Sequence, residues 1–80
     1  MTIKQRIVEI TAEELEIDSN LLKTDQDLRT RYNVDSLMSL QLVAAIETEF
    51  GILIDDEDLH AYTTIDVIAD VVGKYVLQAA

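Results

Sequence analysis

Cysteine and proline are absent from the 80 residues, and glycine occurs only at Gly51 and Gly73. Without cysteine the chain has no disulfide, no thiolate metal site and no side-chain thiol chemistry. Without proline or glycine-rich stretches no linker divides the chain, so we expect a single domain over residues 1–80. The longest apolar run is the five residues Leu42 to Ile46, whereas a membrane span needs about 20. We therefore expect no transmembrane helix and, because no apolar signal core follows Met1, a cytoplasmic location.

Basic residues are scarce: 6 Lys and Arg stand against 16 Asp and Glu, a formal charge of −10. No Lys or Arg occurs from Tyr32 through Gly73. Such a surface repels nucleic acids and anionic lipids, and it speeds encounters with basic proteins. We expect a monomer whose partners are basic proteins, although an acidic surface can also serve solubility alone.

Most of the sequence has the spacing of apolar residues that is typical of helices. Thr2 and Gln5 fit a capping box, and the apolar spacing that follows predicts a first helix over about 3–15. Residues Asp18 to Val34 are typical of a long loop, which isolated leucines would pin to the core: Leu21, Leu22 and Leu28.

Three more helices are predicted in the second half. One begins at Asp35 or Ser36 and runs to Phe50, with Gly51 as its stop. A short one covers Asp55 to Ala61, and the last begins after Thr64. The expected fold is all-α: a small four-helix bundle of three longer helices and one short helix, with a long loop between the first two.

The helix that follows Asp35 is apolar on two sides. At about 100° per residue, its core stripe consists of Ser39, Leu42, Val43, Ile46 and Phe50. The opposite side carries Leu37, Leu40, Gln41, Ala44 and Thr48. Scattered exposed apolar residues are normal, and Leu40 could be half-buried against the preceding loop. The functional alternative is a contact surface for another protein.

Ser36 lies at the predicted start of that helix, where serine is favoured as a cap. His60 is the only histidine, so no Ser-His-Asp set can be assembled, and a bundle this small offers no obvious cleft. We therefore expect no enzyme and no catalytic residue. A helix N-terminus does stabilise anions, so a phosphodiester on Ser36 would be well placed.

The order Asp35-Ser36-Leu37, then the apolar helix ending in Glu47-Thr48-Glu49-Phe50-Gly51, then the acidic stretch Asp55 to Asp58, resembles the acyl and peptidyl carrier proteins. The resemblance implies that a phosphopantetheinyl transferase moves 4′-phosphopantetheine from coenzyme A onto Ser36, with Asp35 helping recognition. The arm's thiol would carry acyl groups as thioesters. It also implies a partner-binding face of Leu37, Met38, Leu40, Gln41, Ala44, Glu47, Asp55, Asp56 and Glu57. Partners would include an acyl-loading ligase or acyltransferase and a ketosynthase.

Several positions depart from the usual carrier pattern. Asn33 stands where glycine is usual and Asp55 where proline is common, while Met38, Gln41 and Thr48 are neutral where fatty acid carriers have acids. These departures favour a free-standing acyl carrier of a specialised fatty acid, modified-lipid or polyketide-type pathway of secondary metabolism. An aminoacyl or peptidyl carrier of a nonribosomal peptide-type pathway is the alternative.

Two rivals come from other classes. The first is an acidic helical interaction module without a prosthetic group. The second is a calcium-binding protein, suggested by Asp25-Gln26-Asp27 and by Asp55 to Asp58. Neither stretch has the spaced ligands, central glycine and terminal Glu of a twelve-residue calcium loop, so we expect no specific metal site.

Overall fold

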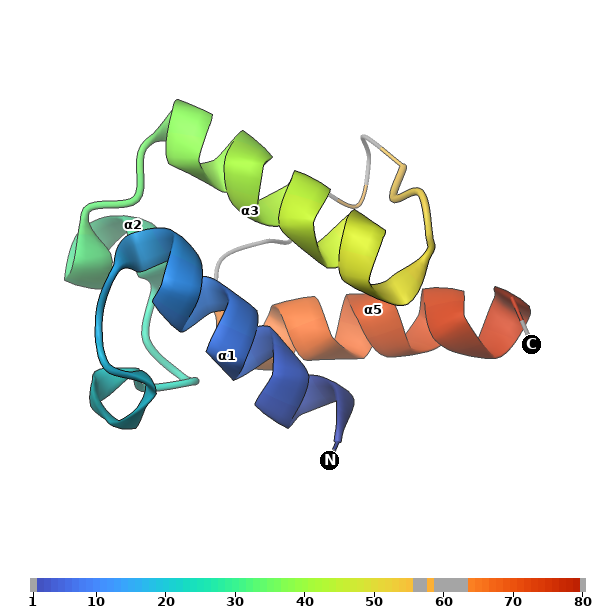
Figure 1. The fold of residues 1–80 in the computed structure, drawn as a ribbon, viewed down its shortest axis with the longest axis horizontal. Helices are drawn as coiled ribbons and strands as arrows, with labels where there is room; N and C mark the ends of the chain where they lie inside the picture. Colours follow the sequence, from blue (N-terminus) through green and yellow to red (C-terminus); the bar gives the residue numbers. More distant parts are fainter. Residues whose placement is uncertain (1, 56–57, 59–63, 80) are drawn as a thin grey trace.

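The computed structural model describes residues 2–55, 58 and 64–79. Its helices are α1 (Ile3–Leu15), α2 (Leu28–Tyr32), α3 (Ser36–Phe50) and α5 (Ile65–Ala79), and a 3-10 turn, η1 (Ser19–Leu21), follows α1. These residues contain no strand. The predicted fold class, a small all-α bundle, is confirmed (Figure 1). Its longer helices are α1, α3 and α5, and the short helix α2 lies in the segment that was predicted to be a loop. The short helix predicted over Asp55 to Ala61 falls largely outside the described residues.

Helix α1 begins and ends where local chemistry satisfies its backbone. The Thr2 side chain accepts a hydrogen bond from the Gln5 N–H, and the Gln5 side chain accepts one from the Thr2 N–H, which confirms the capping box. At the other end Glu16 adopts the left-handed conformation, with φ 56°. The Ile17 N–H then donates a hydrogen bond to the Ala12 carbonyl at 3.0 Å, an arrangement common at the C-terminal ends of helices.

The prediction of one long loop over Asp18 to Val34 was incomplete, because η1 and α2 lie within it. Asp18 caps η1 by accepting from the Asn20 N–H, and Asp27 caps α2 by accepting from two N–H groups of its first turn. Helices this short show no apolar periodicity in the sequence.

The leucines of this region do not all reach the core. Leu22 and Leu28 are buried as predicted, whereas Leu21 is 67% exposed. Leu21 and Leu22 are neighbours at the end of η1, so both cannot face inward. The Tyr32 hydroxyl of α2 holds this turn by accepting from the Lys23 N–H at 2.8 Å.

The predicted bounds of α3 are confirmed at both ends, from Ser36 to Phe50 with Gly51 as the left-handed stop. Its inward side is the predicted stripe: Leu42, Val43 and Ile46 are buried, and Ser39 and Phe50 are half-buried.

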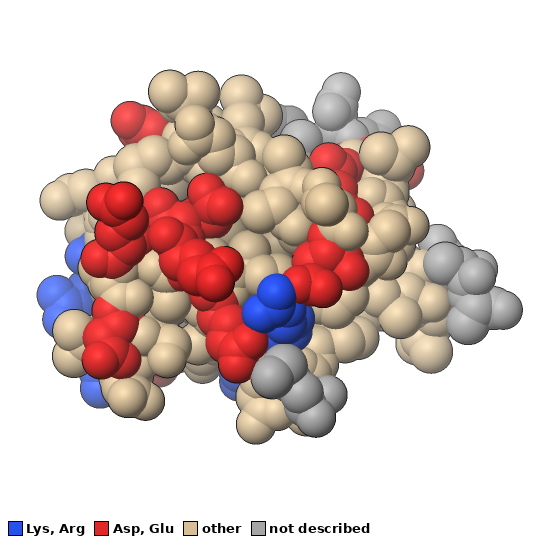
Figure 2. Space-filling model, in the orientation of Figure 1, with Lys and Arg blue, Asp and Glu red and all other residues tan. Residues whose placement is uncertain are grey.

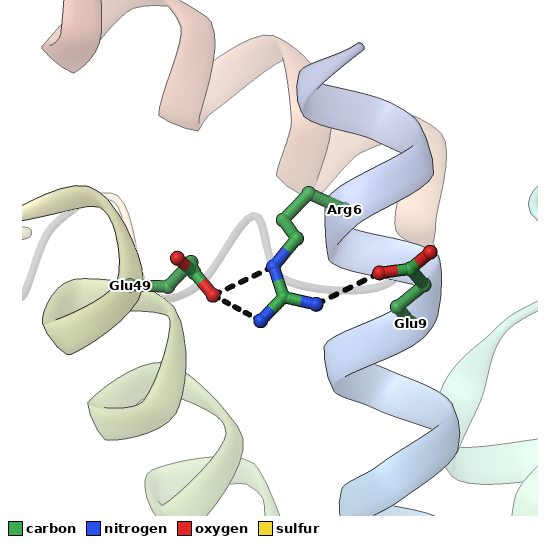
Figure 3. A network of polar contacts seen from close by, with 3 residues as sticks. All are labelled: Arg6, Glu9 and Glu49. Atoms are coloured by element: carbon green, nitrogen blue, oxygen red, sulfur yellow. Dashed lines mark hydrogen bonds and ion pairs between the residues drawn. The ribbon is translucent and has the colours of Figure 1, made fainter. Parts of the chain in front are cut away.

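Helix α1 packs against both α3 and α5 (Figure 1). The side chains that are completely buried come from all three of these helices: Ile7, Thr11, Ile46, Ile65, Ile68 and Val72. Ion pairs join the same helices at the surface. Lys4 of α1 pairs with Asp66 of α5 at 2.5 Å. Arg6 of α1 pairs with Glu49 of α3 and also with Glu9 of its own helix (Figure 3). None of the described helices is long and apolar enough to cross a membrane.

Candidate functional site

The turn before α3 aims the start of that helix outward. Asn33 ends α2 in the left-handed conformation, with φ 56° and ψ 35°, and its N–H donates to the Leu28 carbonyl. The Val34 N–H donates to the same carbonyl at 3.3 Å, and Val34 is buried. Asparagine tolerates this conformation better than most residues, so its presence where carriers usually have glycine leaves the turn intact. With Val34 held inward, Asp35 and Ser36 lie exposed.

Asp35, and not Ser36, caps α3. The Asp35 carboxylate accepts from the Met38 N–H at 2.8 Å, and the Asp35 carbonyl accepts from the Ser39 N–H at 2.9 Å. Ser36 is the first helical residue and is exposed. Its hydroxyl has no hydrogen-bond partner among the described residues. The sequence suggested two roles for Ser36, a helix cap and a point of attachment for a phosphodiester. In the structure Asp35 is the cap, and the Ser36 hydroxyl remains accessible.

The first turn of α3 suits an anion attached to Ser36. In a helix the first N–H groups have no intrahelical acceptor, and Asp35 satisfies that of Met38. The N–H groups of Ser36 and Leu37 are left at the positive end of the helix dipole, where phosphate is stabilised. The residues present therefore fit a phosphodiester on the Ser36 oxygen.

The outward side of α3 is apolar and uncharged. Leu37 is 64% exposed and Leu40 is 60% exposed, so the alternative of a half-buried Leu40 was wrong. Gln41, Ala44 and Thr48 are exposed beside them, as predicted. Met38 was predicted to belong to the partner-binding face, but it is half-buried and packs against the core.

The predicted acidic partner residues divide into three groups. Glu47 is half-buried, and its carboxylate accepts from the Ile54 N–H at 2.8 Å, a structural bond that the sequence did not reveal. Asp55 is exposed, and its N–H donates to the Tyr75 hydroxyl of α5 at 3.0 Å. Asp56 and Glu57 lie outside the described residues, as does His60.

Leu53, at 83%, is the most exposed large apolar residue in the described part of the chain, and the sequence analysis did not single it out. It stands between Ile52 and Ile54, which are both buried. The signal was available in the sequence: in an extended segment neighbours point to opposite sides, so burial of the two isoleucines turns the leucine outward.

Acidic side chains gather over α1 on the face shown in Figure 2. Glu13 and Glu14 of α1 and its C-cap Glu16 are exposed, and Glu9 is half-buried. The Arg6 guanidinium is the basic group between Glu9 and Glu49 (Figure 3), and the Glu49 hydrogen bond above all raises the pKa of Arg6. In the part of the chain that the structure describes, no three acidic or histidine side chains come together as metal ligands.

The fold and the site define a class, a small helical protein with an exposed serine in the first turn of α3. The family model described as "Phosphopantetheine attachment site" matches residues 5–72. The chain is 36% identical over 74 residues to the acyl carrier protein of Rickettsia massiliae (strain Mtu5), an alignment that covers 92% of this chain and 81% of that one. It is 36% identical over 70 residues to the acyl carrier protein of Rickettsia canadensis (strain McKiel), covering 88% and 78%.

A solved structure of the acyl carrier protein from Enterococcus faecalis shares the fold. Its TM-score is 0.76 at 24% identity, and the match covers 94% of this chain and 99% of that one. The chain belongs to the acyl carrier protein family. The prosthetic group of this family is 4′-phosphopantetheine, and its members are carriers rather than catalysts.

Proposed function

We propose that residues 1–80 act as one carrier domain and that Ser36 is its phosphopantetheine attachment point. The observation that carries this proposal is the exposed Ser36 hydroxyl in the first turn of α3, beside N–H groups without an intrahelical acceptor. Asp35 supports it by taking the capping role that would otherwise occupy the serine oxygen.

The attachment step is a transfer from coenzyme A, made by a phosphopantetheinyl transferase. The Ser36 oxygen forms a bond to the phosphorus that bears the pantetheine, the pyrophosphate P–O bond breaks, and 3′,5′-ADP leaves while the hydroxyl proton passes to a base of the transferase. Once bound, the group supplies the thiol that a cysteine-free chain lacks. Ser36 and Leu37 then stabilise the phosphodiester with their N–H groups.

Intact mass spectrometry tests the attachment. The apo-protein is incubated with coenzyme A, Mg²⁺ and a promiscuous phosphopantetheinyl transferase, beside Ser36→Ala and the matched control Ser39→Ala on the same helix. We expect a gain of one phosphopantetheine in the wild type and in Ser39→Ala, and none in Ser36→Ala. A folded wild type that gains no mass, or a Ser36→Ala chain that gains it, contradicts the proposal; the first result favours an interaction module without a prosthetic group.

The outward side of α3 is the partner-binding face in this proposal. Leu37 and Leu40 would be its apolar anchors, since aliphatic side chains exposed near the attachment point are the ones a docked enzyme would cover. Asp35 would aid the transferase, and the acids Glu47, Asp55, Asp56 and Glu57 would meet basic residues at the edge of the face.

Leu40→Glu separates this docking role from a role in folding. The side chain is 60% exposed, so we expect the helical signal and the midpoint of thermal unfolding to stay nearly unchanged. The KM for the protein in the transferase reaction should rise about tenfold, because losing one apolar anchor costs an interface more than 1 kcal/mol. Leu21→Glu, at a similarly exposed position in η1, is the control that should leave KM unchanged. Unfolding of Leu40→Glu would instead show that Leu40 belongs to the core.

The neutral face also supports a specialised pathway of the fatty acid, modified-lipid or polyketide type. Gln41 and Thr48 are exposed and neutral at positions where general fatty acid carriers have acids, and the half-buried Met38 is neutral at a third such position. We expect the holo-protein to be a poorer substrate for an organism's general fatty acid enzymes than that organism's main carrier. Equal rates would contradict specialisation, and loading with an amino acid by an adenylating ligase would favour the peptidyl alternative.

A further inference from the structure

Thr11 of α1 is a polar residue in the middle of the core. It is 0% exposed, and among the residues that the structure describes it is the only buried polar one. Helical residues four positions apart share one face, and on α1 that row is Ile3, Ile7, Thr11 and Leu15. Ile7 is completely buried, while Ile3 and Leu15, at the ends of the row, pack against the core. Thr11 therefore stands where the pattern predicts an aliphatic side chain.

The Thr11 hydroxyl has no hydrogen-bond partner among the described residues. By contrast, the Thr48 hydroxyl donates to the Ala44 carbonyl at 2.9 Å. The Thr64 hydroxyl accepts from the Val67 N–H at 3.1 Å. A buried hydroxyl without a partner costs free energy, because it has given up its hydrogen bonds to water and gained none in return. Such groups are rare in folded proteins, so this one requires a physical reason.

The surroundings of Thr11 make water a poor partner. The other completely buried side chains of α1, α3 and α5 are all aliphatic: Ile7, Ile46, Ile65, Ile68 and Val72. A buried water needs about 2–4 polar partners, and Thr11 is the only polar side chain buried among these residues. A molecule that satisfies the hydroxyl must be mostly apolar and carry an isolated polar atom.

The cargo of the proposed arm has this chemistry. Acyl groups are largely aliphatic, so a chain attached through Ser36 gains free energy when it leaves water for an apolar interior. Helix α3 carries Ser36 on its exposed first turn and has Leu42 and Ile46 buried in the core. A fully reduced chain in the core leaves the Thr11 hydroxyl unpaired. A chain with a hydroxyl or a ketone can pair with it, because the Thr11 hydroxyl both donates and accepts.

We infer that Thr11 is a specificity-determining residue: its hydroxyl hydrogen-bonds an oxygen on the skeleton of an acyl chain held in the core, so that the protein prefers hydroxyacyl or ketoacyl cargo to fully reduced chains. The inference deepens the proposed function and rests on attachment at Ser36. A buried polar group discriminates strongly, because a ligand without the matching group leaves it unpaired. Among the pathways proposed above, this preference favours one that leaves oxygen on the chain.

Loaded proteins test the preference. The transferase attaches the arm to Ser36 from coenzyme A derivatives that carry octanoyl or 3-, 5- or 7-hydroxyoctanoyl groups, each linked as an amide so that it survives heating. Intact mass verifies each product, and the midpoint of thermal unfolding is then measured. We expect one hydroxyl position to raise the midpoint above that of the octanoyl form by about 4–8 °C, the shift that one hydrogen bond gives a domain of this size. A ketone at that position should raise it as well.

Variants of Thr11 show whether its hydroxyl is responsible. Without cargo, Thr11→Val should melt about 4–8 °C higher than wild type, because it removes an unpaired buried group. With cargo, its octanoyl form should be more stable than its hydroxyoctanoyl forms. Thr11→Ser keeps the hydroxyl and should keep the wild-type preference. Thr48→Val is the matched control, since it removes an exposed hydroxyl from α3 and should leave the preference unchanged.

The Thr11 methyl resonance of ¹³C-labelled protein is a second readout that does not depend on stability. It should shift between the octanoyl form and the preferred hydroxyoctanoyl form, because the hydroxyl on the same side chain gains a partner. The Thr48 methyl resonance should stay in place. Equal Thr11 shifts for every cargo would contradict contact with the chain oxygen.

Further outcomes separate this inference from the attachment proposal. A wild type that gains no mass refutes attachment, and the inference with it. A loaded wild type in which no hydroxyl position exceeds octanoyl refutes the inference alone, as does a preference that survives in Thr11→Val. An unloaded Thr11→Val chain that is less stable than wild type would show that the hydroxyl is already paired, which also overturns the inference.

Discussion

Among the residues that the structure describes, two non-glycine residues hold left-handed backbone conformations, and each ends a helix. Glu16 closes α1 and Asn33 closes α2. The conformation brings a side chain close to its own backbone and costs a typical residue about 1–2 kcal/mol. Asn33 bears more directly on the proposed function, because it lies three residues before Ser36, the proposed attachment point.

Asn33→Val should lower the free energy of unfolding by about 1–2 kcal/mol, since a β-branched side chain fits this backbone poorly. Asn33→Gly should leave it equal or slightly higher, because glycine adopts positive φ freely. Urea unfolding followed by circular dichroism measures both. If valine and glycine gave the same stability, the left-handed turn would not be what the asparagine supplies.

Side-chain contacts join α1 to its neighbouring helices. Lys4 reaches Asp66 at the start of α5, and the Asp66 N–H also donates to the Thr24 carbonyl of the loop. The Lys4 hydrogen bond lowers the pKa of Asp66 the most, partial desolvation opposes it, and the Thr24 side chain adds to the lowering. Asp66 therefore binds its proton less readily in the folded protein than in the unfolded chain.

The lowered pKa of Asp66 makes the stability of the folded protein depend on pH. Because the folded pKa of Asp66 is depressed, its contribution to stability is fully present above the unfolded value of about 3.9. The contribution is lost as the pH falls through the folded pKa. We expect Asp66→Asn to be less stable than wild type at neutral pH, with a difference that shrinks as the pH falls below about 4.

Urea unfolding of the wild type and of Asp66→Asn between neutral and acidic pH measures this difference. The other carboxylates titrate in both proteins, so the difference isolates the contribution of Asp66. Lys4→Met should reproduce the loss at neutral pH by removing the partner that lowers the pKa. A difference between wild type and Asp66→Asn that does not change with pH would contradict the ion-pair account.

The whole molecule carries a charge of −10, which acts on folding and on association in opposite ways. Like charges over α1 repel one another in the compact state, and salt screens this repulsion. The same charge draws basic partners, and salt screens that attraction too.

Adding salt to about 0.5 M should therefore raise the midpoint of thermal unfolding and slow association with the transferase. Replacing Glu13 and Glu14 with Gln changes the charge from −10 to −8 and should reduce the response of the midpoint. Thermal melts and stopped-flow association measure the two effects. A midpoint that falls with salt would show that specific ion pairs, such as those of Arg6, outweigh the general repulsion.

Much of this protein was predictable because its signals are local. The capping box at Thr2, the stop at Gly51 and the two-sided character of α3 each depend on residues within a few positions of one another. The fold class, the bounds of α1 and α3, and the position of Leu37 and Leu40 opposite the core stripe of α3 were all predicted from these patterns, whereas half-burial of Leu40 had remained an alternative. The order of elements around Asp35-Ser36-Leu37 also indicated the carrier family before any coordinate was known.

The remaining features were decided only by the tertiary structure. They depend on contacts between residues distant in sequence, or on which of two neighbouring side chains is buried in the core. Helix α2 is too short for periodicity to reveal. Met38 packs against the core, and Leu53 is exposed because its neighbours Ile52 and Ile54 are buried. The sequence alone was enough to assign the kind of protein and to single out the serine, whereas packing determined the shape of the surface that a partner meets.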